Sequence, residues 1–210
     1  MDKKKTDKKA VFERIYGEEW HRLHPAIKGH TNAIPFTNDV ITLKGTIDIE
    51  YSPMMKLVLP FVRFTGALMP YDGKNIPCTT YIKSEENSDA VIFDRVIHYS
   101  KVDPKKEDGH FTSRMFYHGP NTIAEFVKMG VGIYVKYFPE SDKDISLDHG
   151  GYFWNILGFK IPVPLGFILG DLYGEEEALS EDTYRMVAGS KHFLFGQMFE
   201  YRAKFKIEKE

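Results

Sequence analysis

The chain has 210 residues, enough for one domain with a large core, and its 42% hydrophobic and 14% aromatic content argues against disorder except at the ends. Its 28 basic and 30 acidic residues leave a formal charge of −2, which argues against a nucleic-acid-binding surface because such a surface needs a concentrated surplus of Lys and Arg. Cys78 is the single cysteine; it excludes an intrachain disulfide and fits a reducing, cytoplasmic location.

The N-terminus carries the one run of like charges. Five lysines (Lys3, Lys4, Lys5, Lys8 and Lys9) fall within residues 1–9, and we predict a flexible basic tail there, with weak contact to anionic lipid as the functional alternative. Acidic residues follow instead of an apolar stretch, so the run does not indicate a secretory signal. A single domain is predicted over residues 10–210.

The first predicted elements are a helix, a strand and a second helical segment. Residues 10–24 have helical spacing, and Pro25 is expected to end that helix. From Val40 to Tyr51 apolar and polar residues alternate, which predicts a half-buried strand. Residues 53–69 are apolar almost all round, as expected of a helix packed between the core and another element.

Short strand-like runs with intervening turns occupy most of the remaining chain. They cover residues 76–83, 91–100, 111–118, 123–129, 131–138, 145–148, 152–156, 183–188 and 197–207, with Gly150–Gly151 as an expected hairpin turn. This order predicts a mainly β fold with few helices: an antiparallel barrel or half-barrel, an N-terminal helix, and a helical segment between the first two strands. Helix-grip folds share the plan but close with a long C-terminal helix. Here the chain ends in an alternating strand, which favours the barrel.

Two apolar segments resemble membrane spans but are predicted not to cross a bilayer. Residues 53–70 contain two charges and an internal proline, and residues 156–169 are too short and contain Pro162 and Pro164. We expect the second segment to form a loop or a short edge strand. It either packs over a barrel opening or serves as a portal that meets an apolar ligand or a membrane surface.

The strand predicted at 91–99 carries a charge in the middle of an apolar face. Arg95 shares that face with Phe93, Ile97 and Tyr99. An unpaired charge in a core is too costly to remain unsatisfied, so Arg95 requires a carboxylate from the protein or from an acidic ligand. A guanidinium suits a carboxylate because its fork makes two parallel hydrogen bonds.

The next strands offer a second arginine and a carboxylate. Arg114 shares a face with Thr112 and Phe116, and Glu125 lies between two apolar residues. Two interpretations follow: Glu125 neutralises a buried arginine in a network that fixes strand register, or one arginine is free to anchor a carboxylate or phosphate head group. The predicted ligand-binding residues are Arg95, Arg114, Glu125, Tyr99 and Tyr201.

No complete catalytic, metal or nucleotide motif occurs in the sequence. Of the eight histidines, only His21 and His24, with Glu18, have a spacing that brings ligands to one helix face, whereas a zinc site needs three or four. No nucleophile elbow or phosphate-binding loop is present. We therefore predict no metal and no cofactor, and name no catalytic residue. His98 is expected on the opposite face from Arg95.

Several short motifs resemble a known family. They are His24-Pro25, Gly45, Leu68-Met69-Pro70-x-x-Gly73, Arg95, Ser113-Arg114-Met115, Glu125, Gly158 with Pro162 and Pro164, and His192 with Tyr201. Over residues 12–207 the chain resembles a bacterial family known only as a domain of unknown function, whose members occur alone or fused behind saccharopine-dehydrogenase-like reductases. The resemblance implies a helper domain that binds an apolar or acyl substrate.

Three functions compete at this point. The first is a binding module for an apolar or acyl, lipid-like small molecule inside a barrel, with buried arginine at its head group. The second is an enzyme of undefined reaction in the same cavity, with Glu125 or His98 as acid–base group. The third is an interaction domain without a ligand, whose apolar segments dock a partner.

Overall fold

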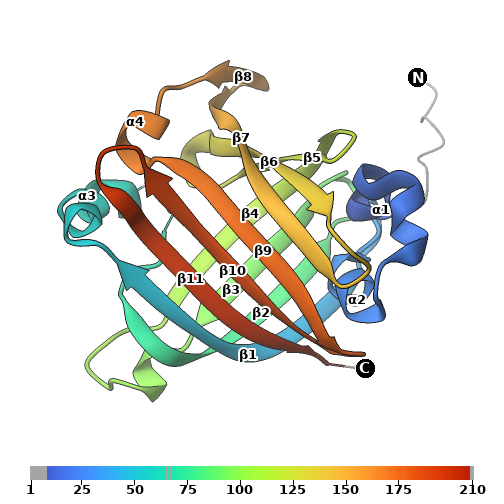
Figure 1. Ribbon diagram of the computed structural model, residues 1–210, viewed down its shortest axis with the longest axis horizontal. Coiled ribbons are helices and arrows are strands. Elements are labelled where there is room, and N and C mark those ends of the chain that lie inside the picture. Colours follow the sequence, from blue (N-terminus) through green and yellow to red (C-terminus); the bar gives the residue numbers. More distant parts are fainter. Residues whose placement is uncertain (1–8, 65, 67, 209–210) are drawn as a thin grey trace.

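In the computed structural model, which describes residues 9–64, 66 and 68–208, a single antiparallel sheet closes on itself (Figure 1). Residues 1–8 of the predicted basic tail lie outside this range. The strands are β1 (Val40–Tyr51), β2 (Gly73–Ser84), β3 (Val91–Ile97), β4 (Gly109–Gly119), β5 (Thr122–Phe126), β6 (Val131–Pro139), β7 (Asp144–Ile156), β8 (Phe159–Pro162), β9 (Asp171–Ser180), β10 (Thr183–His192) and β11 (Gly196–Ile207). The order is β6-β5-β4-β3-β2-β1-β11-β10-β9-β7-β8, and β6 also pairs with β7. That pairing closes a ten-strand barrel and leaves β8 outside the ring, which confirms the predicted fold class.

The alternation predicted for the first strand holds in the barrel. Leu43, Ile47 and Ile49 of β1 are buried, and the strand is paired along most of its length with β2 and with β11. Residues that alternate in sequence point to opposite faces of a strand, so one face of β1 supplies the core and the other meets solvent.

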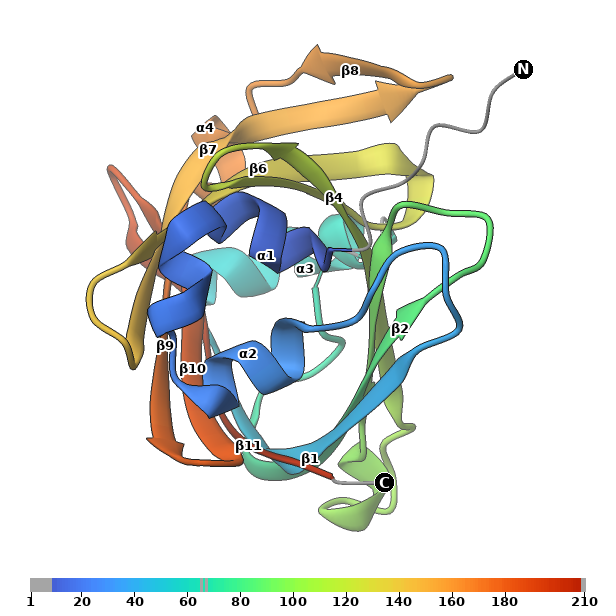
Figure 2. The same ribbon diagram turned by 90° about the vertical axis from the view of Figure 1, so that its right-hand side faces the viewer.

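The N-terminal segment forms two helices instead of one. Residues Val11–Tyr16 (α1) continue into a 3₁₀ helix, Gly17–Arg22, and α2 (Pro25–Thr31) follows. Pro25 begins α2, because proline suits the first helical position, where no N–H donor is needed. The His24 side chain accepts a hydrogen bond from the backbone N–H of Ala26 at 3.3 Å. Figure 2 shows α1 and α2 lying across one end of the barrel, here called the helix end.

The predicted second helical segment is α3 (Pro53–Phe64), between β1 and β2. Met55 is fully buried, but Leu57 and Phe61 are 70% and 79% exposed. The helix is therefore covered on one side only, contrary to the expectation that it is packed on both. No described helix is long and apolar enough to span a bilayer, in line with the prediction for residues 53–70 and 156–169. The latter segment contains the short edge strand β8 and α4 (Gly166–Leu169).

Two predictions about turns and strands were wrong. Gly150 and Gly151 lie inside β7, at a register shift opposite Tyr134, where a Cβ atom on Gly150 would meet the Tyr134 carbonyl oxygen at 2.7 Å. They form a bulge that lets two strands approach closely. Strand β9 was not predicted at all, because its inward positions include Gly174 and Glu176 instead of a continuous apolar row.

Asp108 stabilises the connection between β3 and β4 through its side-chain contacts. It accepts a hydrogen bond from the Ser100 N–H at 3.0 Å and lies 3.2 Å from Nδ1 of His98. Hydrogen bonds from Ser100, together with His98, lower the pKa of the Asp108 carboxyl to about 2. A carboxyl whose pKa is lower in the folded state stabilises the fold at pH values above its unfolded pKa, and this contribution disappears as the pH falls through the folded pKa.

We therefore expect Asp108→Asn to lower the urea midpoint at about pH 6 and to lower it less near the folded pKa of Asp108, at about pH 2. Urea unfolding of both proteins at the two pH values measures this. An equal loss at both would mean that ionisation of Asp108 does not stabilise the loop.

A candidate ligand cavity inside the barrel

The barrel encloses a cavity of about 220 Å³. All ten strands of the ring contribute to its wall, and Phe12, His30 and Thr31 line it at the helix end. Most of the lining is aliphatic or aromatic. This volume is more than ten times what a single buried water needs, so the interior has room for a small molecule.

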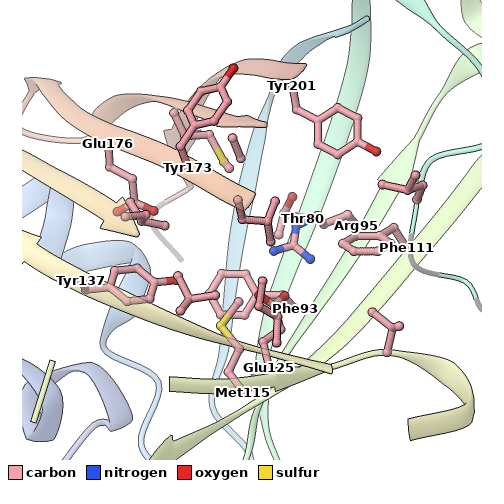
Figure 3. A pocket seen from close by; sticks show the side chains of 18 of the residues that line it. Thr80, Phe93, Arg95, Phe111, Met115, Glu125, Tyr137, Tyr173, Glu176 and Tyr201 are labelled. Atoms are coloured by element: carbon pink, nitrogen blue, oxygen red, sulfur yellow. The ribbon is translucent and has the colours of Figure 1, made fainter. Parts of the chain in front are cut away.

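Arg95 projects into this cavity from β3 (Figure 3). Its guanidinium carbon lies 5.0 Å from the ring centre of Phe93 and 5.1 Å from that of Phe111, the residue opposite it on β4. One terminal nitrogen donates to the Ser113 hydroxyl at 3.1 Å. The predicted inward orientation of Arg95 is therefore correct, and the two aromatic rings stabilise its charge by cation–π contact.

Within the described chain no carboxylate oxygen lies within 4.0 Å of the Arg95 guanidinium. Glu125 also lines the cavity, from β5, but makes neither an ion pair with Arg95 nor any other hydrogen bond to a described residue. The interpretation in which Glu125 directly neutralises a buried arginine is therefore wrong. The cavity thus contains the Arg95 guanidinium and the Glu125 carboxylate without contact between them, and most of the guanidinium N–H donors have no acceptor among the described residues.

A histidine–glutamate pair occupies another part of the wall. The His30 Nδ1–H group donates to the Ala26 carbonyl oxygen at 2.8 Å, and Nε2 lies 3.3 Å from the Glu176 carboxylate. The pair joins α2 to β9 across the cavity wall. The His30 ring also stacks on Tyr184 at 3.9 Å.

Two tyrosines also contribute to the cavity wall. Burial, together with the charges of Glu176 and Glu125, raises the pKa of Tyr137 well above its ordinary value, so its hydroxyl remains a donor at all physiological pH values. Tyr201, predicted as a site residue, also lines the cavity. Its hydroxyl lies 2.9 Å from that of Tyr51, which donates to the Met69 carbonyl at 2.8 Å. Tyr201 therefore offers mainly its ring to the cavity.

Two other predicted site residues lie outside the cavity wall. Arg114 points to the outer face, where it is 44% exposed and forms two hydrogen bonds with Glu85, at 3.1 and 3.2 Å. Its neighbours Ser113 and Met115 are the inward residues of β4, so alternation turns Arg114 outward. Tyr99 is buried in a 3₁₀ turn after β3 and donates to the Tyr71 carbonyl at 2.7 Å.

The candidate acid–base group His98 also lies outside. It contacts Thr79 and Asp108, on the far side of the wall from Arg95, which matches the predicted opposite face and separates it from any chemistry in the cavity. Cys78 does line the cavity, but burial raises the pKa of its thiol to about 11, so the weakly nucleophilic thiol form prevails at neutral pH. Among the described residues no three His, Cys, Asp or Glu side chains gather as metal ligands.

Sequence reasoning missed Glu176, His30 and Tyr137. Glu176 was lost with the unpredicted strand β9, and His30 was grouped with the scattered histidines because α2 was not foreseen. Tyr137 lies in a predicted strand, with inward spacing relative to Val135 and Ile133. This spacing was the sequence signal that could have identified Tyr137 as a cavity residue.

The comparisons bear on the whole barrel. A family model described as a domain of unknown function, DUF4166, matches residues 23–205. The chain belongs to this family. The matched stretch of this DUF4166 domain includes every strand of the barrel, except the last two residues of β11, and every polar cavity residue discussed above. No curated protein matches the chain. The bacterial origin and the association with reductase domains stay predictions.

Proposed function

We propose that this DUF4166 domain binds an apolar or acyl small molecule inside its barrel, with an anionic group of the ligand at Arg95. The observation that carries the proposal is a guanidinium without a carboxylate partner among the described residues, held in a largely apolar cavity of about 220 Å³. An arginine in such a place loses hydration on entering the protein, and an anionic ligand group restores the lost interactions through two parallel hydrogen bonds.

The apolar wall supplies most of the affinity. A ligand that removes roughly 200 Å² of apolar surface from water gains about 5 kcal/mol before the cost of association. Phe93 and Phe111 flank the guanidinium. The anionic group of a ligand and the adjoining part of its apolar chain therefore bind next to each other. This arrangement suits an amphipathic molecule better than a fully apolar one.

Glu125 restricts the ligand further. Its carboxylate lines the same cavity without an ion pair or hydrogen bond to a described residue, whereas the Glu176 carboxylate lies 3.3 Å from Nε2 of His30. A second anionic group near Glu125 is unfavourable, and a hydroxyl or amide donor there is favourable. We expect a ligand with one anionic group and a hydrogen-bond donor close to it.

Mass spectrometry tests the proposal directly. Native spectra of gently purified protein, beside spectra of its organic extract, are expected to show one ligand per chain that carries a carboxylate or phosphate. An empty protein that also fails to take up labelled fatty acids and lysophospholipids would contradict the proposal, and the cavity would then hold only water.

A further inference from the structure

Six large apolar side chains project from the barrel end opposite α1 and α2. They are Leu57 and Phe61 of α3, Leu157 and Phe159 of the β7–β8 hairpin, Phe167 of α4, and Phe193 of the β10–β11 turn, and each is 70% to 94% exposed. We call these six residues the rim. Figure 1 shows α3, α4 and the β10–β11 turn close together on the left, with β8 above them and α1 and α2 at the opposite end, on the right. Exposed apolar groups concentrated at one end of a molecule indicate an interaction site.

Leu157 shows that folding alone does not account for the rim. It is 94% exposed and occupies the tip of the β7–β8 hairpin with a φ of 51°, followed by Gly158 at 89°. Two successive positive φ values define a hairpin turn that favours asparagine then glycine, and a branched apolar residue at the first position is strained. A leucine there is unfavourable for both backbone conformation and solvation, so its presence points to contact outside the fold.

A buried histidine holds part of the rim in place. Nε2–H of His192 donates to the Phe167 carbonyl oxygen at 3.0 Å, and Nδ1 accepts from the Leu194 N–H at 3.1 Å. These roles fix one neutral tautomer and tie α4 to the β10–β11 turn. The ring also stacks on Phe193, with 4.6 Å between centroids. The positions of α4 and the β10–β11 turn, which carry Phe167 and Phe193, are therefore held in place before the rim meets any partner.

The charges near the rim are mainly positive. Lys128, Lys160 and Lys191 are exposed, and none forms an ion pair with a described carboxylate. Lys160 lies between Phe159 and Ile161 on β8, whose four residues are all exposed. Two acidic groups also lie nearby: Asp171, at the start of β9 and 3.7 Å from His149, and Asp72, which pairs with Lys56 of α3. Anionic lipid head groups complement such lysines, at about five-fold in affinity for each.

We propose that the rim docks this domain onto the surface of an anionic lipid bilayer, with the apolar tips in the interfacial layer and the lysines at the head groups. Separate tips that project from several connections suit insertion between lipids, whereas a protein partner is usually met by a continuous surface with a closely packed centre. The proposal goes beyond ligand binding and does not require an occupied cavity.

Vesicle binding tests the proposal on the full chain. We expect co-sedimentation with vesicles of phosphatidylcholine and phosphatidylserine, and much weaker binding to phosphatidylcholine alone. Brominated lipids are expected to quench Trp154, which is 44% exposed near the rim, whereas Trp20 is buried at the helix end. Leu157→Asn should weaken binding about ten-fold while raising the thermal midpoint, because asparagine tolerates the positive φ.

Leu179→Asn is the matched control. Leu179 is 44% exposed at the end of β9, on the helix end of the barrel, and its substitution should leave vesicle binding unchanged. Lys160→Glu should weaken binding to phosphatidylserine vesicles without unfolding the protein. If the protein binds neither kind of vesicle, the proposal is overturned. So would a dimer in sedimentation that dissociates on Leu157→Asn, since a second copy would then cover the rim.

Discussion

Arg95→Met is expected to weaken ligand binding by at least about 30-fold while leaving the barrel folded. The side chain contributes one hydrogen bond, to the uncharged hydroxyl of Ser113, and no ion pair with a described residue. Replacing a half-buried charge by an apolar chain of similar length is often neutral or stabilising. The free energy of unfolding of the empty protein should therefore stay within about 1 kcal/mol of wild type or rise. Loss of the guanidinium from its anionic partner should cost binding about 2–5 kcal/mol, which is at least 30-fold.

Titration with a labelled fatty acid, beside urea unfolding of the same samples, measures both quantities. Arg114→Met is the matched control, because Arg114 pairs with Glu85 on the outer face and its removal should leave affinity unchanged. Arg95→Lys should bind with intermediate affinity, since lysine keeps the charge but loses the fork. If Arg95→Met unfolds the barrel, or if Arg95 and Arg114 variants bind equally well, Arg95 does not hold the ligand.

Gly45→Ala is expected to cause the largest loss of stability. Gly45 lies in the middle of β1, opposite Phe205 of β11 and Cys78 of β2. A Cβ atom at this position would lie 1.9 Å from the carbonyl oxygen of Lys204, a backbone atom that cannot turn away. The two strands would have to separate, at a cost of about 3 kcal/mol or more.

Gly119→Ala provides the comparison, because a Cβ atom on Gly119 meets no atom within 4 Å. This variant should stay within about 0.5 kcal/mol of wild type. Urea or thermal unfolding of the two variants measures the difference. If Gly45→Ala and Gly119→Ala were equally stable, β1 and β11 would not approach each other closely at Gly45.

The alternation of apolar and polar residues along single strands was enough to predict much of the fold. In β1 and β11 nearly every second residue is apolar, so the faces and the antiparallel barrel class follow from the sequence. Arg95 was placed correctly for the same reason: Phe93 and Ile97 on either side of it are strongly apolar, so its face had to be the inner one. The helical segment between the first two strands was also foreseen.

Strand β4 shows where this reasoning stops. Both of its faces mix polar and aromatic residues, so the sequence established that Arg114 shares a face with Thr112 but not which face looks inward. In β9 the inward row contains Gly174 and Glu176, and the strand was missed. These assignments depend on neighbouring strands, because pairing with β3 and β10 determines which side of each strand meets the core.

The sequence by itself determined a mainly β chain, its barrel class and an arginine on an inner face, since these depend on periodicity within single strands. Only the tertiary structure decided that Arg95 and Glu125 are not in contact, that His30 meets Glu176, and that the rim gathers at one end. The physical reason is barrel closure. Distances between residues of different strands are set by register around the whole ring, and no local pattern encodes that register.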